Sequence, residues 1–143
     1  MSKHYTLIVG SMLGASEYVA DALAEQLREA GHQVSIELEP DLTTINPGSI
    51  WVVITSTHGA GDLPDNIQSF AAQLKSSKLS QVNAFVIGLG DSSYDTFCYG
   101  AKTIETLLQQ SGATLLDAPL HIDVLDHPIP EEKAVEWFES RLA

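Results

Sequence analysis

Cysteine, basic side chains and long hydrophobic runs are all scarce in this sequence. The one cysteine, Cys98, excludes an internal disulfide and is typical of a protein from a reducing compartment. The apolar runs have the length of strands, which is too short for a membrane span or a secretory signal. We therefore expect a cytoplasmic protein that has no membrane partner.

Basic residues are outnumbered by acidic ones. Seven Lys and Arg stand against nineteen Asp and Glu, which gives a formal net charge of −12. Such a chain repels the phosphates of nucleic acids and of anionic lipids, so nucleic acid is not an expected partner. The charge has two interpretations that the sequence leaves open. It either serves solubility alone, or it steers basic protein partners and raises their association rate.

Strand-length apolar runs alternate with amphipathic helical patterns along the 143 residues, with no repeat and no linker between them. This alternation predicts a single α/β domain over 1–143, in which a parallel sheet has helices on both faces. Gly31 is the expected stop of the first helix. The predicted strands are 5–9, 34–38, 50–54, 84–89 and, more weakly, 114–122, and the helical patterns cover 19–30, 67–74, 97–108 and 135–142.

The strand patterns also predict an order. The runs at 5–9, 50–54 and 84–89 are almost continuously apolar, as expected inside a sheet. The run at 34–38 alternates with polar residues and the last one contains Pro119, so both are predicted to be edges. Three interior and two edge strands fit a five-stranded sheet of order 2-1-3-4-5. In that order the carboxyl ends of strands 1, 3 and 4 adjoin where the winding reverses, which is where ligands bind.

The loops after these three strands are rich in glycine, which lets a ligand approach the backbone closely. Three such loops at one crevice are more than turns require, so they predict a binding site. None of them contains Lys or Arg. They read GSMLGAS (10–16), TSTHGAGDLPDN (55–66) and GLGDSSYDTFCYG (88–100).

The missing cation limits the ligand. A diphosphate or a triphosphate is normally met by a cation or a metal, whereas backbone N–H groups at a helix N-terminus can hold a single phosphate. The hydroxyls of Ser11 and Ser16 can add donors. The first loop therefore predicts a mononucleotide-like monophosphate.

Other phosphate and catalytic motifs do not fit. The glycines of the first loop are too closely spaced for a P-loop, and neither G-x-G-x-x-G nor G-x-S-x-G occurs. Strand 3 runs into Thr55 and Ser56, where a response regulator needs an aspartate. Ser56, His58 and Asp62 crowd one loop, which does not favour a catalytic triad. The residues give no sign of an enzyme that transforms its own substrate.

The strings STHGAGDLPDN and GLGDSSYDTFC resemble the flavodoxin family, and the likeness extends over nearly the whole chain. The first string and LDHPIPEE…EW look most like the MioC type of short-chain member. The resemblance implies a flavodoxin-like three-layer sandwich that binds FMN and holds no metal. It places these residues at the cofactor: Ser11, Met12, Leu13, Gly14, Ala15, Ser16, Ser56, Thr57, His58, Gly59, Ala60, Gly61, Gly90, Asp91, Tyr94, Phe97 and Cys98.

The resemblance also implies roles for single residues. Tyr94 would stack on the outer face of the flavin, and His58 stands where the family has an aromatic residue on the other face. Gly59 would turn its peptide toward the reduced ring. The acids Asp62, Asp65, Asp91 and Asp95 would lower the flavin potential and present an acidic collar to a basic partner.

The first loop departs from the family pattern. Leu13 and Ala15 stand where hydroxyl residues are usual, while Ser11 and Gly14 match. Each lost hydrogen bond weakens phosphate binding by about 0.5–1.5 kcal/mol, so FMN is expected to be held weakly.

By this resemblance the chain is a monomeric carrier of single electrons rather than an enzyme. Its partners would be a basic-faced flavoprotein reductase of the ferredoxin/flavodoxin–NADP type and an acceptor enzyme of the biotin-synthase kind. Two alternatives stay open at this point. One is a binding or regulatory domain that keeps the fold but has lost the flavin, and the other is an FMN-dependent quinone reductase.

Overall fold

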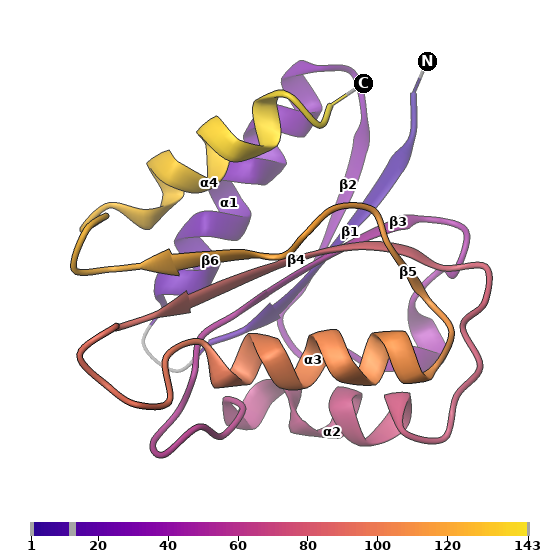
Figure 1. The fold of residues 1–143 in the computed structure, drawn as a ribbon. Helices are drawn as coiled ribbons and strands as arrows, with labels where there is room; N and C mark the ends of the chain where they lie inside the picture. Colours follow the sequence, from indigo (N-terminus) through magenta and orange to yellow (C-terminus); the bar gives the residue numbers. More distant parts are fainter. Residues whose placement is uncertain (1, 12–13, 143) are drawn as a thin grey trace.

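The computed structural model describes residues 2–11 and 14–142, in which one parallel sheet lies between two pairs of helices (Figure 1). α1 and α4 cover one face of the sheet, and α2 and α3 cover the other. The strands are β1 (His4–Gly10), β2 (Gln33–Glu37), β3 (Ile50–Thr55), β4 (Asn83–Gly90), β5 (Thr114–Leu115) and β6 (Leu120–Asp123). The helices are α1 (Ala15–Glu29), α2 (Asp65–Leu74), α3 (Tyr99–Gln110) and α4 (Pro130–Glu139), with a 3₁₀ turn at Leu42–Thr44.

The predicted strand order is confirmed, with one correction at the last position. The sheet runs β2-β1-β3-β4, and both β5 and β6 then pair in parallel with β4. The single strand expected over 114–122 is therefore two short strands. Leu116 N still donates to Ala84 O of β4 at 2.8 Å, and residues 117–119 then leave the sheet. Pro119 has no N–H to donate, and Asp117 turns its carboxylate to Arg141.

The core consists of two apolar layers separated by the sheet. Successive side chains of a strand point to opposite faces, so a continuous apolar run contributes to both layers. In β3, Trp51 and Val53 pack toward α2 and α3, whereas Val52 packs toward α1 and α4. Phe70 on α2 and Phe138 on α4 are fully buried, one in each layer. Both faces of the interior strands are thus covered, as their sequence pattern predicts.

The ends of the helices agree only in part with those predicted from the sequence. α1 stops before Gly31, as expected, and that glycine has the positive φ of 90° that ends a helix. The third helix was expected to include Phe97, but α3 begins at Tyr99. The reason is Cys98, whose φ of 55° breaks the helical path just before it. Leu142 was placed on the fourth helix, but α4 ends at Glu139.

Candidate functional site

The three glycine-rich loops meet at one end of the sheet, on the left of Figure 1. Their strand ends are in register, because Gly10 pairs with Thr55 and Thr55 pairs with Gly88. Ser56 N donates to Gly10 O at 3.0 Å, and Gly100 N donates to Thr57 Oγ1 at 2.9 Å. The first loop is thus fastened to the second, and the second to the start of α3.

The first loop leads directly into the N-terminus of α1. Gly14 is the N-cap with a φ of 91°, a conformation that glycine adopts without strain, and it forms no side-chain cap. The first N–H groups of a helix have no intrahelical acceptor and carry partial positive charge. Gly14 N donates to Ser11 Oγ at 2.9 Å, which leaves the Ser11 hydroxyl hydrogen available to an anion. This donor set fits a single phosphate; Met12 and Leu13 lie outside the described residues.

Ser16 takes a different position from Ser11. Its side chain is fully buried, and its hydroxyl lies 2.8 Å from that of Ser56. Ala15 is half-buried and packs at the edge of the apolar layer beneath α1. The Ser16–Ser56 bond therefore joins two loops of the site, and the donor that Ser16 can offer an anion is its backbone N–H.

The second loop folds into a tight turn closed by two backbone hydrogen bonds. His58 N donates to Asp62 O at 2.7 Å, and Asp62 N donates to His58 O at 2.8 Å. His58, Gly59 and Ala60 are exposed at its tip. A Cβ on Gly61 would lie 3.1 Å from the Tyr99 ring, so this turn packs closely on the start of α3.

A pocket of about 470 Å³ opens between the second and third loops. This volume is within the range of roughly 300–1,000 Å³ that is common for cofactor sites. Tyr94 borders the pocket with 66% of its surface exposed, so its ring is available to stack on a ligand. The lining residues are Thr57, Gly59, Asp91, Tyr94, Thr96, Phe97 and Cys98. Of these, the sequence missed Thr96, although it stands in the same short loop as its neighbours.

Cys98 lies under the third loop and is closed to solvent. Burial raises the pKa of its thiol to about 12, so the sulfur stays protonated near neutral pH. A Cβ on Gly90 would lie 2.9 Å from Cys98 N and 3.0 Å from Cys98 Sγ. Gly90 is thus required for the close approach of β4 to the start of α3, and Cys98 packs rather than reacts.

The third loop is held from the side by β6. Val124 N donates to Gly90 O at 2.9 Å, and Asp123 Oδ1 accepts from Ser92 N at 3.3 Å and from Leu125 N at 3.0 Å. The side chain of Ser92 first, and then these two backbone N–H groups, hold the pKa of Asp123 below its usual range. The sequence did not single out Asp123, because Ser92, through which it holds the third loop, is 31 residues away along the chain.

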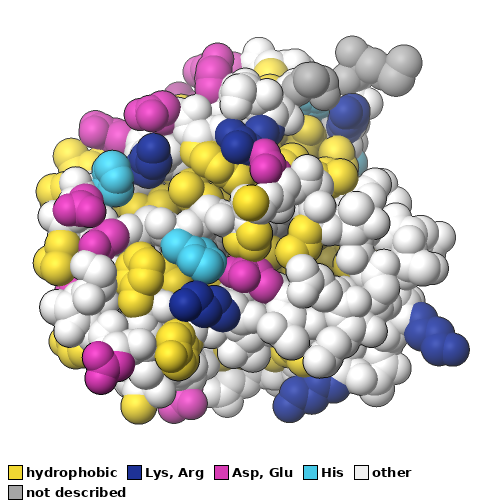
Figure 2. Space-filling view, viewed as in Figure 1, with side chains coloured by type: hydrophobic (Ala, Val, Ile, Leu, Met, Phe, Trp, Pro, Cys, Tyr) yellow, Lys and Arg dark blue, Asp and Glu magenta, His cyan; other side chains and the backbone are white. Residues whose placement is uncertain are grey.

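Apolar and acidic side chains share the loop end of the sheet. Among the residues that the structure describes, the exposed large apolar side chains all lie there except Leu116, which follows β5. Figure 2 shows most of the acidic side chains in view along the left and upper left of the molecule, whereas the Lys and Arg side chains are scattered over the face. The exposed apolar residues at this end are Tyr18, Leu38, Tyr94, Tyr99, Leu125 and Ile129.

The described residues were also searched for a metal site and for a membrane-spanning helix. Within residues 2–11 and 14–142, no three His, Cys, Asp or Glu side chains are grouped so that they could hold a metal ion. Over the same ranges, no helix is both long enough and apolar enough to span a membrane.

Comparison with known proteins gives consistent matches along the chain. Residues 7–138 match the family described as flavodoxin. Protein MioC of Escherichia coli (strain K12) is 47% identical, covering 94% of this chain and 93% of that protein. Flavodoxin YqcA of the same strain is 38% identical, again over 94% and 93%. A C101A mutant of flavodoxin from Pseudomonas aeruginosa superposes with a TM-score of 0.89 at 30% identity, covering 97% of this chain and 96% of that one.

Proposed function

The chain belongs to the flavodoxin family of FMN-binding electron carriers, and on this premise we propose that it passes single electrons from a flavoprotein reductase to an acceptor enzyme. The observation that supports this proposal is the position of two features at the same end of the sheet. One is the N-terminus of α1, whose preceding loop has no Lys or Arg, and the other is the pocket bordered by Tyr94. FMN, once bound, supplies the redox chemistry, and the protein positions and tunes it. The chain itself contributes no substrate-transforming group in this proposal.

The first loop would hold the phosphate of FMN. Its donors are the Ser11 hydroxyl and the backbone N–H groups at the start of α1, including those of Ala15 and Ser16. Because Ala15 has no hydroxyl and that of Ser16 is bonded to Ser56, fewer side-chain donors reach the phosphate than in the family pattern. We therefore propose that FMN binds weakly enough to be lost in purification.

The second and third loops would hold the ring. Tyr94 supplies a stacking surface, and such a stack contributes about 1 kcal/mol beyond the buried area. Gly59 has no side chain to oppose a turn of its peptide, so its carbonyl can be offered to the ring in one redox state only. The exposed acids Asp62, Asp65 and Asp95 would disfavour added negative charge on the ring and so lower its potential.

The same acids would select the partner. The exposed apolar side chains give a docking centre, and the surrounding carboxylates attract a protein with a basic face. A reductase of the ferredoxin/flavodoxin–NADP type and a biotin-synthase-like acceptor are the proposed donor and acceptor. The single cysteine agrees with exchange between these partners in the cytoplasm.

The direct test is reconstitution with FMN, followed by a spectral titration of the bound flavin. A saturable change in the flavin spectrum is expected. Absence of FMN binding would contradict the proposed role as an electron carrier. It would favour the alternative, a domain of the same fold that no longer binds the flavin.

The partner surface is tested by removing charge. Electron transfer from a basic-faced reductase should slow as salt rises, because exposed charges are screened within about 10 Å at 0.1 M ionic strength. Asp95→Asn should slow the reaction at low salt. Glu29→Gln, the same charge change at the far end of α1, should not. A rate independent of salt in all three proteins would leave solubility as the role of the acids.

A further inference from the structure

Asn66, in the first turn of α2, binds three backbone groups, which belong to β1, to the residue after β2 and to the first loop. Its Oδ1 accepts from Ser11 N at 2.9 Å. Its Nδ2 donates to Val9 O at 2.7 Å and to Leu38 O at 2.7 Å. A side-chain amide has two donor hydrogens and one carbonyl oxygen, so both donors and the oxygen have a backbone partner.

These contacts lie where two strands separate. The parallel pairing of β1 with β2 ends at Ile8 and Glu37; Val9 is the next residue of β1, and Leu38 is the first residue after β2. Both carbonyls accept from the amide of Asn66 instead. The side chain thus continues the pairing of β1 and β2 beyond the point where the strands themselves pair.

The third contact leads to the candidate phosphate site. Asn66 fixes Ser11 N, and the hydroxyl of Ser11 accepts from Gly14 N at 2.9 Å. Gly14 is the N-cap of α1. A continuous series of hydrogen bonds therefore runs from α2 through Ser11 to the helix N-terminus that would receive the phosphate.

We propose that Asn66 is a positioning residue for the phosphate of FMN, which it does not need to touch. It sets the direction of the Ser11 hydroxyl and the entry of the first loop into α1, so that these donors are arranged before the ligand arrives. This inference rests on the proposed function, because it presumes that the first loop receives the phosphate. It gives a role to the last residue of the second loop as the sequence delimits it, a residue that the structure places in the first turn of α2.

An amide suits this position better than a carboxylate. Aspartate would keep the acceptor for Ser11 N but would lose both donors to the strand carbonyls. It would also place a second negative charge beside Asp65, close to where an anionic phosphate is held. Asn66→Asp should therefore weaken phosphate binding more than Asn66→Ala does.

The discriminating experiment compares FMN with riboflavin, which has the same ring and no phosphate. The dissociation constants of both are measured by flavin fluorescence for the wild type, Asn66→Ala and Asn66→Asp. Asn83→Ala, at the opposite end of the sheet, is the matched control. Loss of Asn66 should raise the FMN constant roughly tenfold, as expected for one strong hydrogen bond. The riboflavin constant should stay within about twofold, since stacking on the ring is unaffected.

The outcomes separate this inference from the proposed function. A wild type that binds neither flavin overturns the proposed function itself. A wild type that prefers FMN, with a preference that Asn66→Ala leaves intact, overturns only the role of Asn66. Equal weakening of both flavins also overturns it, because that is the result of a merely structural residue. Should Asn66→Ala fail to fold, the near-isosteric Asn66→Asp answers the same question.

Discussion

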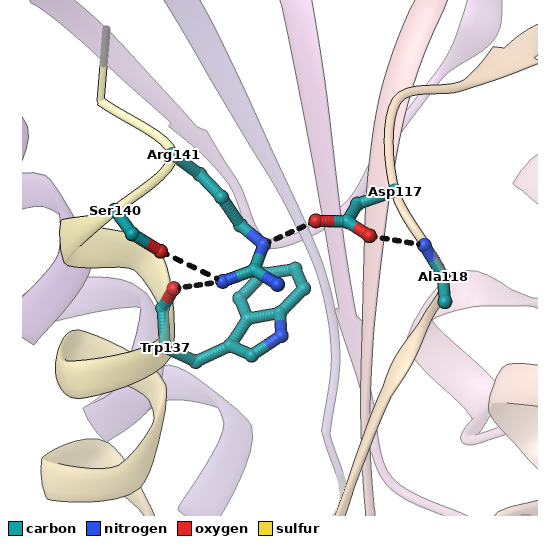
Figure 3. Close-up of polar contacts among 5 residues, drawn as sticks. All are labelled: Asp117, Ala118, Trp137, Ser140 and Arg141. Atoms are coloured by element: carbon teal, nitrogen blue, oxygen red, sulfur yellow. Dashed lines mark hydrogen bonds and ion pairs between the residues drawn. The ribbon is translucent and has the colours of Figure 1, made fainter.

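Arg141 Nε donates a 2.6 Å hydrogen bond to Asp117 Oδ2, which joins the end of α4 to the segment between β5 and β6 (Figure 3). The same guanidinium donates to Trp137 O at 2.5 Å, and its Cζ lies 4.1 Å from the centre of the Trp137 ring. One side chain thus connects a helix C-terminus, an aromatic ring and the interrupted edge of the sheet.

Arg141→Ala should lower the free energy of unfolding by about 1–2 kcal/mol, since it removes an ion pair, a cation–π contact and a carbonyl hydrogen bond. Lys133→Ala, on α4 itself, is the control, because Lys133 Nζ lies 3.6 Å from Glu136 Oε1 in an ordinary helical pair. That change should stay within about 0.5 kcal/mol. Urea denaturation measures both, and equal effects would contradict a special role for Arg141.

The contribution of Asp117 should depend on pH in a defined direction. The N–H of Ala118 and the Arg141 side chain hold the pKa of Asp117 below its usual value. Its carboxylate therefore stabilises the fold above the unfolded-state pKa of about 3.9, and this contribution disappears as the pH falls through the lower folded value. Asp117→Asn should destabilise the protein at pH 7 but have little effect near the acid limit of folding. A difference in stability that is constant with pH would be inconsistent with this assignment.

The Cys98 thiol should be inert in the folded protein. It is fully buried and its pKa is raised to about 12, so very little thiolate exists at pH 8. A disulfide reagent such as DTNB should label it only slowly in the native state and completely in denaturant. Native labelling as fast as that of the denatured chain would show that the start of α3 opens readily.

Gly100→Ala should disturb the junction between the second loop and α3. The new Cβ would lie 2.6 Å from Ser56 O, a backbone atom that has little room to move. Overpacking of this kind destabilises a protein by about 1–3 kcal/mol. Gly48→Ala is the control, because the atom nearest to its Cβ would be Oδ1 of the Asn46 side chain, at 3.2 Å, which can move aside. Thermal unfolding compares the two, and a harmless Gly100→Ala would show that this junction is loose.

Tyr94→Ala should weaken FMN and riboflavin alike, by about fivefold, because stacking acts on the ring that both share. Tyr94→Phe retains the ring and should bind nearly as well as the wild type. The pattern is the opposite of that expected for Asn66, where only the phosphate-bearing flavin is affected. If Tyr94→Ala binds both flavins as the wild type does, Tyr94 has no stacking role.

Where both faces of a strand are buried, the sequence predicts it well. β1, β3 and β4 are continuous apolar runs, and their positions and order agree with the structure. The last strand was predicted less well, because its interruption depends on the contact of Asp117 with Arg141, which is 24 residues away. The start of α3 was missed because a positive φ at a non-glycine residue such as Cys98 leaves no local signal.

The candidate site, like the fold, was predicted from the sequence only in part. Its three loops were predicted from glycine content and strand order, and the structure brings them together. Asn66, Thr96 and Asp123 were not predicted as site residues. Asn66 reaches Ser11 across 55 residues, and Asp123 reaches Ser92 across 31, so their parts depend on the tertiary fold. The roles assigned to individual residues toward FMN remain predictions, which the flavin titrations test.

The break between β5 and β6 also affects how the molecule meets its own copies. An exposed edge strand can template the addition of a strand from another chain, which leads to aggregation. Here one edge of the sheet is formed by β5, which has two residues, and β6, which has four. Pro119 and Asp117, which is ion-paired, lie between these two strands. The other edge, β2, is five residues long and ends in Glu37. Neither edge presents a long row of backbone groups, and on the β5–β6 side the interruption disfavours fibril-like addition of further strands.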